Sequence, residues 1–114
     1  MTEYQFIDSD QELENAIKII ESETTIYLDT EFVRDFDYIP KIGLIQIGTK
    51  KQIFLFDAIK CDIKPLINIL INPDVLKIMH SATQDCDVFY KNYEIFPKPI
   101  FDTQIAASIL GIGD

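Results

Sequence analysis

Residues 26–33 have the sequence Ile26-Tyr27-Leu28-Asp29-Thr30-Glu31-Phe32-Val33, an apolar, strand-like run with two carboxylates two positions apart. Successive side chains of a strand point to opposite faces, so Asp29 and Glu31 share a face with Tyr27 and lie roughly 6 to 7 Å apart. Two ionised carboxylates in an apolar setting repel each other and lose hydration unless cations neutralise them. Because carboxylate oxygens select hard cations such as Mg²⁺ or Mn²⁺, the pair predicts a metal site on a buried strand. The alternative is an edge strand whose two acids simply face water.

The composition indicates one domain with a substantial core. A chain of 114 residues with 47% hydrophobic residues and 8 phenylalanines can bury roughly two thirds of its unfolded surface. Its apolar runs are too short to span a membrane, and residues 1–5 lack the features of a signal peptide, so a cytoplasmic protein without a membrane partner is expected. Cys61 and Cys86 show no zinc-type spacing with the single His80, which predicts ordinary buried or half-buried thiols.

The charge balance argues against a simple nucleic-acid binder. The chain has 19 acidic and 10 basic residues, which gives a net charge of −9. Much of the acidic excess lies between Glu3 and Glu23, where it predicts a solvated acidic helix face. Such a protein repels phosphate backbones unless bound divalent metals or an additional basic segment change the local field.

Hydrophobic periodicity and capping signals predict alternating strands and helices. Ser9-Asp10-Gln11-Glu12 is a capping box ahead of an amphipathic helix that includes Leu13 and Ile20. Strands are expected at 4–7, 25–31, 43–48, 52–56 and 76–79, with a brief extended piece at 100–101 and further helices at 64–71, 83–93 and 103–111. The three strands between 25 and 56 should form an antiparallel meander with a tight turn at Lys50-Lys51. The pattern is typical of an α/β fold in which helices pack on the faces of a mixed sheet.

A third acid lies where a strand passes into a helix. The run His80-Ser81-Ala82-Thr83-Gln84-Asp85 places Asp85 in the first helical turn, close to the strand ends where ligands gather, so Asp85 is expected to face Asp29. The alternative needs no function, because the helix dipole favours an aspartate in a first turn. Asp87 lies about 200° further around the helix and is expected to face solvent.

Four blocks of the sequence carry a family resemblance. They are Leu28-Asp29-Thr30-Glu31-Phe32-Val33-Arg34, Tyr38-Ile39-Pro40-Lys41-Ile42-Gly43-Leu44-Ile45-Gln46, His80-Ser81-Ala82-Thr83-Gln84-Asp85-Cys86-Asp87-Val88-Phe89 and Phe101-Asp102-Thr103-Gln104-Ile105-Ala106-Ala107. In order and spacing they resemble the amino-terminal part of the ribonuclease D type of 3′-5′ exonuclease. That type belongs to the DEDD superfamily, so the resemblance implies a ribonuclease H-like mixed sheet with flanking helices.

The resemblance also implies a role for each matched acid. Asp29 and Glu31 fill the first exonuclease motif, and Asp85 supplies the acid of the second. In the family these acids hold two divalent metal ions, Mg²⁺ or Mn²⁺, for hydrolysis of the terminal phosphodiester at the 3′ end of RNA such as tRNA precursors. One metal makes a bound water nucleophilic, and the other stabilises the leaving 3′ oxygen.

Residues near the motifs are candidates for binding substrate. Phe32 and Tyr38 are expected to stack on a terminal base, and Arg34 to contact a phosphate. Core packing explains Phe32 equally well, and an ion pair with a neighbouring aspartate explains Arg34. His80 matches the start of the second motif and is expected to be a supporting group, not a general base. Asp102 is expected to cap and orient the helix that follows it.

The sequence departs from the family after the second motif. The family completes its site with a fourth acid and a tyrosine or histidine in a third motif, which has no counterpart before Asp114. Residues 1–114 are therefore expected to form a partial exonuclease domain, truncated before the last helices and inactive alone. Such a chain would be part of a longer enzyme, pair with a second chain that supplies the third motif, or self-associate through an exposed apolar face. The alternatives are a non-catalytic remnant or interaction module, and part of a DNA proofreading exonuclease.

Overall fold

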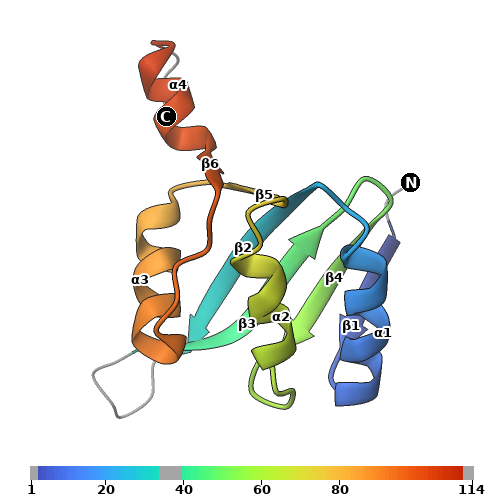
Figure 1. The fold of residues 1–114 in the computed structure, drawn as a ribbon. Helices are drawn as coiled ribbons and strands as arrows, with labels where there is room; N and C mark the ends of the chain where they lie inside the picture. Colours follow the sequence, from blue (N-terminus) through green and yellow to red (C-terminus); the bar gives the residue numbers. More distant parts are fainter. Residues whose placement is uncertain (1–2, 34–39, 112–114) are drawn as a thin grey trace.

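The protein is a six-stranded sheet with helices packed on one face (Figure 1). The computed structural model describes residues 3–33 and 40–111. From the N-terminus its elements are β1 (Glu3–Ile7), α1 (Asp10–Ile20), β2 (Thr25–Val33), β3 (Lys41–Gly48), β4 (Gln52–Asp57), α2 (Lys64–Leu70), β5 (Leu76–Met79), α3 (Ala82–Tyr93), β6 (Ile100–Asp102) and α4 (Thr103–Ile109). Helices α1, α2 and α3 lie on the same side of the sheet, whereas α4 extends beyond the sheet from the end of β6.

The sheet is mixed, as the sequence predicts. Its strand order is β1-β4-β3-β2-β5-β6. Strands β2, β3 and β4 form the expected antiparallel meander, while β1 pairs parallel to β4, β5 parallel to β2, and β6 parallel to β5. The parallel pairs need crossover connections, which α1, α2 and α3 provide. Strand β2 is therefore central, with a neighbour on each side.

Helix α1 begins at the predicted capping box. The hydroxyl of Ser9 accepts a hydrogen bond from the Glu12 amide at 3.2 Å and donates to the Glu12 carboxylate at 3.0 Å. The buried side chains of α1 are Leu13, Ala16, Ile17 and Ile20, which recur at the spacing of one helical face. Burial of this face directs α1 onto the sheet.

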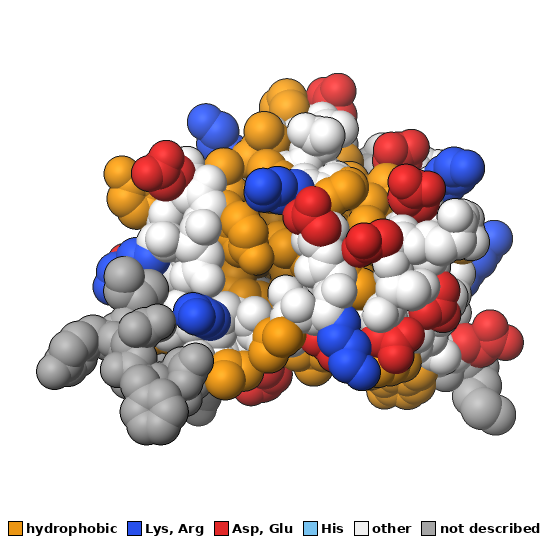
Figure 2. Space-filling view, turned by 90° about the horizontal axis from the view of Figure 1, so that it is seen from below, with side chains coloured by type: hydrophobic (Ala, Val, Ile, Leu, Met, Phe, Trp, Pro, Cys, Tyr) orange, Lys and Arg blue, Asp and Glu red, His pale blue; other side chains and the backbone are white. Residues whose placement is uncertain are grey.

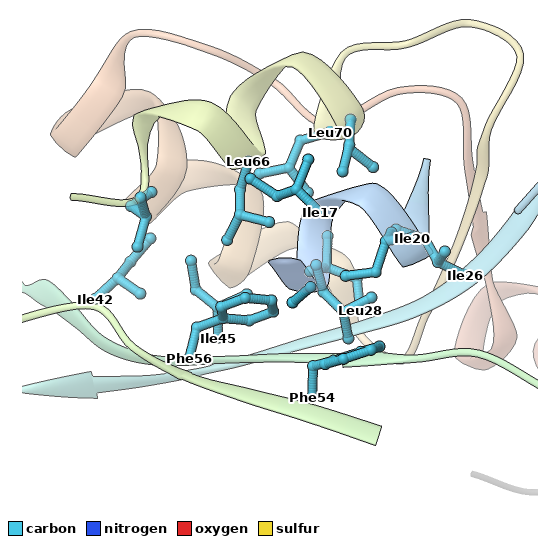
Figure 3. Close-up of a cluster of buried hydrophobic side chains, with 14 of the residues drawn as sticks. Ile17, Ile20, Ile26, Leu28, Ile42, Ile45, Phe54, Phe56, Leu66 and Leu70 are labelled. Carbon is cyan, nitrogen blue, oxygen red and sulfur yellow. The ribbon is translucent and has the colours of Figure 1, made fainter. Parts of the chain in front are cut away.

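The core fills the space between the sheet and its helices (Figure 3). Inward-facing residues of β2, β3 and β4 meet the apolar faces of α1 and α2, as shown by Leu28, Ile45 and Leu66. Phe54 and Phe56 are fully buried and stack with their ring centroids 6.1 Å apart. This single layer of packing holds the strand that carries Asp29 and Glu31 in place.

In the described part of the chain, no helix covers the opposite face of the sheet. Residues that pair directly on neighbouring strands project from the same face of the sheet. On the helix-free face, one line of such pairs crosses all six strands. We call this line the outer row; its members are Tyr4, Ile53, Gly48, Tyr27, Ile78 and Phe101. The side chains of Tyr4, Tyr27 and Phe101 are 68%, 55% and 49% exposed. The protein thus presents an apolar stripe on its helix-free face.

Acidic side chains gather at the end of the molecule where α1 begins. Figure 2 views the protein from that end and shows more acidic than basic side chains on the α1 side.

The thiol of Cys61 is buried, and its pKa is raised by burial and then by the charges of Asp10, Asp57 and Asp8. Cys61 and the half-buried Cys86 are free thiols, as predicted. Separately, every described helix is too short or too polar to traverse a bilayer.

Candidate active site

Asp29 and Glu31 lie on the helix-free face of β2. Both side chains are exposed and share that face with Tyr27, as the alternation of the strand predicts. The structure agrees with the alternative for this part of the strand, because Asp29 and Glu31 face solvent and the pairing of β2 with β5 ends at Tyr27. The expected burial of the two acids is wrong, because the described chain leaves this face open to solvent. Beyond Tyr27 the short strand β5 ends, so this part of β2 pairs only with β3.

Asp85 reaches the same part of β2 from the first turn of α3. The residue is 8% exposed, and its carboxylate accepts a hydrogen bond from the Thr30 hydroxyl. Burial raises the pKa of Asp85, and the charges of Asp29 and Glu31 raise it further, while the bond from Thr30 lowers it. The charges of Asp29 and Glu31 therefore act on Asp85, whose hydrogen bond is with Thr30.

Sequence reasoning missed Thr30. It lies between the two acids on the opposite, inward face of β2 and is 7% exposed. A polar side chain at an inward strand position must find a hydrogen-bond partner, and this requirement was the available signal. Its partner Asp85 is 55 positions away in the sequence, so only the fold identifies the pair.

Two hollows flank Asp29 on the open face. The larger has a volume of about 360 Å³ and is lined by Tyr27, Leu28, Asp29, Gln46, Ile78, Met79, His80 and Thr103. The smaller, of about 70 Å³, is lined by Asp29, Thr30, Glu31, Leu44 and Gln46. Asp29 and Gln46 line both hollows, so a group bound in either one would meet the carboxylate of Asp29.

His80 lines the larger hollow, and Asp102 precedes Thr103, another of its lining residues. The ring Nδ1 of His80 lies 2.8 Å from the Thr103 hydroxyl, consistent with a supporting role. Asp102 caps α4 as predicted, because its carboxylate accepts from the Gln104 and Ile105 amides. The pKa of Asp102 is lowered by hydrogen bonds from backbone amides, first that of Ala82 and then those of Ser81, Gln104 and Ile105.

The acids have the donor chemistry of a magnesium or manganese site, and their arrangement is open. Within residues 3–33 and 40–111, no three His, Cys, Asp or Glu side chains form a group close enough to hold one ion. Asp29, Glu31 and Asp85 offer only carboxylate oxygens, the ligands that hard divalent cations prefer. The negative charges of Asp29 and Glu31 repel that of Asp85, and a bound cation would relieve this repulsion. The donor chemistry thus matches such an ion, whereas the described structure does not bring three of these side chains together around one position.

The remaining predicted residues are placed as follows. Asp87 faces solvent, as expected, and pairs with Lys91 at 3.0 Å. Phe32 is half-buried and packs against the hydrophobic core, in keeping with the core-packing alternative. Arg34 and Tyr38 lie outside the described residues.

Comparison with known families identifies the domain. Residues 4–114 match the family model described as 3′-5′ exonuclease. The chain belongs to the 3′-5′ exonuclease family. Within this family it resembles ribonuclease D: the Haemophilus influenzae protein is 36% identical over 111 residues, and the Escherichia coli protein is 37% identical over 109 residues.

Solved structures of exonucleases of this family have the same fold. The crystal structure of Escherichia coli RNase D, an exoribonuclease involved in structured RNA processing, matches 98% of this chain with a TM-score of 0.89 and 35% identity. The catalytic core of RRP6 from Trypanosoma brucei matches 99% with a TM-score of 0.88 and 26% identity. The expected ribonuclease D-like mixed α/β fold is confirmed.

The chain corresponds to a minor part of each relative. The alignment with Haemophilus influenzae ribonuclease D includes 96% of this chain but only 28% of the relative. The alignment with the Escherichia coli protein includes 95% of this chain and 29% of the relative. In the two structural matches it covers 30% and 32% of the longer chain. The exonuclease fold described here is therefore only part of what those relatives contain.

Proposed function

We propose that the chain provides the first two catalytic motifs of a 3′-5′ exoribonuclease that shortens RNA from its 3′ end, with tRNA precursors as candidate substrates. The observation that supports this most is that three acids of the two motifs lie close enough at β2 for their charges to interact. Asp29 and Glu31 are exposed on its open face, and the charges of both raise the pKa of the buried Asp85. The likeness to Escherichia coli RNase D favours RNA over DNA. We place the activity in the cytoplasm.

Asp29, Glu31 and Asp85 would hold two divalent cations, Mg²⁺ or Mn²⁺. When bound, such ions make a coordinated water acidic and stabilise negative charge on phosphate and leaving-group oxygens. The protein's contribution is to position the ligands. Pairing of β2 with β3 fixes Asp29 and Glu31, and the hydroxyl of Thr30 orients the carboxylate of Asp85. The combined negative charge of these residues attracts the cations.

The larger hollow is our candidate for the 3′-terminal nucleotide. Asp29 and His80 both line it, and the Thr103 hydroxyl lies 2.8 Å from Nδ1 of His80. Its apolar lining residues include Leu28, Ile78 and Met79, which suit the face of a base or sugar. Phe32, Arg34 and Tyr38 remain weaker substrate-binding candidates.

The complete enzyme would need a fourth acid and a tyrosine from outside residues 1–114. We propose that the relatives' additional length supplies the equivalent of these groups, or that a second chain does. Loss of a single stabilising group, such as one of the four acids, typically removes about 3 to 4 kcal/mol of transition-state stabilisation. The isolated chain should therefore bind metal weakly and have little or no nuclease activity.

A combined binding and activity experiment tests this proposal. Mn²⁺ would be titrated by calorimetry into the wild type, Asp29→Asn and the surface control Asp87→Asn, and each protein would be incubated with 3′-labelled RNA. We expect saturable binding in the wild type and Asp87→Asn, loss of binding in Asp29→Asn, and no RNA degradation. Absence of Mn²⁺ binding at millimolar concentration would overturn the metal site, and rapid single-nucleotide release would overturn the need for the fourth acid.

The outer row favours a second candidate function, a non-catalytic interaction module. Tyr4, Tyr27 and Phe101 expose large aromatic surface in a line across a face that no described helix covers. An apolar stripe of this kind marks a surface that another element or chain covers. Self-association that persists when Asp29 is replaced, together with absence of Mn²⁺ binding, would favour this function over the exonuclease.

A further inference from the structure

Asp102 joins the starts of two helices. Its Oδ1 accepts hydrogen bonds from the amides of Gln104 at 2.9 Å and Ile105 at 3.4 Å, at the start of α4, and from the amide of Ser81 at 3.0 Å. Its Oδ2 accepts from the amide of Ala82, the first residue of α3, at 2.7 Å. One carboxylate thus serves four backbone donors from two segments that lie about 20 positions apart.

Helix α3 depends on this carboxylate because Ser81, the residue in its N-cap position, does not cap it with its side chain. Ser81 precedes α3 in the left-handed conformation, with φ at 56°, and its side chain makes no capping hydrogen bond. Its hydroxyl instead donates to the side chain of Gln104 at 2.6 Å. The first amides of a helix have no partner within the helix, so a helix without a local cap needs an acceptor from elsewhere. Asp102 is that acceptor.

Neighbouring bonds join the same two segments. The ring of His80 contacts the hydroxyl of Thr103, and this hydroxyl also lies 3.3 Å from the carbonyl oxygen of Met79, to which it can donate. Strands β5 and β6 pair directly at Met79 and Asp102. The junction between β5 and α3 is therefore fixed against the junction between β6 and α4.

The position of Asp85 follows from this junction. Asp85 is three residues after Ala82, in the turn whose first amide Asp102 holds, and its carboxylate must reach Thr30 on β2. Both oxygens of Asp102 accept backbone amides, so its carboxylate serves the starts of the two helices. We propose that Asp102 is a positioning residue, which holds the start of α3 so that Asp85 meets β2 beside Asp29 and Glu31. This inference rests on the proposed function for its consequence in metal binding, and on the hydrogen bonds alone for the placement of Asp85.

Substitution can separate the two caps of Asp102. In Asp102→Ser the hydroxyl can still cap α4, since serine is among the preferred N-cap residues, but it is too short to reach the amides of Ser81 and Ala82. Asp102→Asn is the milder second variant, because its single oxygen keeps one set of bonds and its amide group opposes the other set. The control is Ile20→Val or Ile20→Ala, whichever lowers the melting temperature by the same amount, since Ile20 is buried in α1 and belongs to neither segment that Asp102 joins.

Two measurements on folded protein test the proposal. The first is the exchange protection of the Thr30 hydroxyl proton by NMR without metal, which reports whether Asp85 is in place. The second is Mn²⁺ affinity by calorimetry. We expect Asp102→Ser to lose the protection and to bind Mn²⁺ at least tenfold more weakly, with a smaller effect in Asp102→Asn and none in the equally destabilised control.

The outcomes separate this inference from the proposed function. Retained protection of Thr30 in both Asp102 variants would overturn the inference, as would an equal loss in the Ile20 control, because the effect would then be one of general stability. If the wild type binds no Mn²⁺ but Asp102→Ser alone loses the Thr30 protection, the metal-dependent function fails and the positioning role of Asp102 stands.

Discussion

Asp85 is a buried carboxylate whose charge lowers the stability of the metal-free protein. Its raised pKa means that the unfolded chain releases the proton first as pH rises. The penalty is therefore absent below the ordinary pKa of 3.8 and grows to its full size as pH rises through the raised value. A cation bound beside Asp85 would remove this loss of stability, so the charge of Asp85 favours cation binding.

Replacement of Asp85 by asparagine should stabilise the metal-free chain at pH 7. Asparagine removes the charge and keeps an oxygen that can accept from the Thr30 hydroxyl. The gain in the free energy of unfolding should exceed about 0.5 kcal/mol, the usual limit for a surface substitution, and should vanish toward pH 3. Urea denaturation between pH 3 and pH 7 measures it.

Asp87→Asn is the matched control for that experiment. It removes only the exposed ion pair with Lys91, so its effect should remain within about 0.5 kcal/mol at every pH. A destabilised Asp85→Asn at pH 7, or an equal gain in both variants, would contradict this account of Asp85.

Lys77 is a second buried charge, on β5. Its side chain is fully buried, and its amine donates to the carbonyl oxygens of Asn72 and Lys98 at 2.8 and 2.9 Å. Burial lowers the pKa of Lys77 to about 8. A neutral amine has two donor hydrogens for these two acceptors, whereas the ammonium ion has a third that the structure does not pair.

Stability should therefore rise with pH in a manner that depends on Lys77. Between pH 8 and the ordinary pKa of 10.5 the unfolded chain binds more protons than the folded chain. The difference in unfolding free energy between wild type and Lys77→Met should increase by up to about 3 kcal/mol across that window. Denaturation curves at pH 7, 8, 9 and 10 measure this, and comparison of the two proteins cancels the titration of Cys61, Cys86 and Tyr93. The exposed Lys60→Met control should show a flat difference; a flat difference for Lys77→Met would show that its amine is not desolvated.

At the scale of elements, a β-bulge sets the end of β2 that carries Glu31. The pairing with β3 shifts between Glu31 and Phe32, which leaves Gly43 as the extra residue opposite them. A Cβ on Gly43 would lie 2.4 Å from the Val33 side chain, so this position has no room for one. The bulge therefore requires a glycine at position 43.

Gly43→Ala should destabilise the protein by about 1 to 3 kcal/mol through overpacking. The double variant Gly43→Ala with Val33→Ala should recover most of the loss, because it removes the methyl groups that clash. Urea denaturation of the two single variants and the double variant gives the coupling free energy. Additive effects would show that the Val33 side chain moves aside at little cost.

At the scale of the whole molecule, the apolar outer row favours self-association of the chain, whereas the net charge of the chain opposes self-association. Opposing charges are screened by salt, whereas apolar contacts are not. With a net charge of −9, association of the isolated chain should be weak at low ionic strength and stronger in about 0.5 M salt.

Sedimentation velocity over a range of concentrations tests this expectation. Tyr4→Lys places a charge in the outer row and should reduce association at least several-fold, at a cost in stability within about 0.5 kcal/mol. Ile19→Lys is the control, since Ile19 is also exposed and apolar but lies on α1. A wild type that stays monomeric at all concentrations and salts, or an equal response in both variants, would exclude the outer row as the contact.

The sequence alone determined the elements and much of the local chemistry of this protein. The capping box at Ser9, the cap at Asp102 and the common face of Asp29 and Glu31 are visible in it, because capping bonds span only a few residues and strand faces alternate with a period of two. The four motif blocks likewise predicted the family that the comparisons confirm.

Only the tertiary structure decided what these residues contact. The bond from Thr30 to Asp85, the second cap that Asp102 provides to α3, and the burial of Lys77 all join segments far apart in the chain. Such contacts depend on the order and register of the strands. Local periodicity does not encode either of these, because each strand could meet its hydrophobic requirement beside several different neighbours.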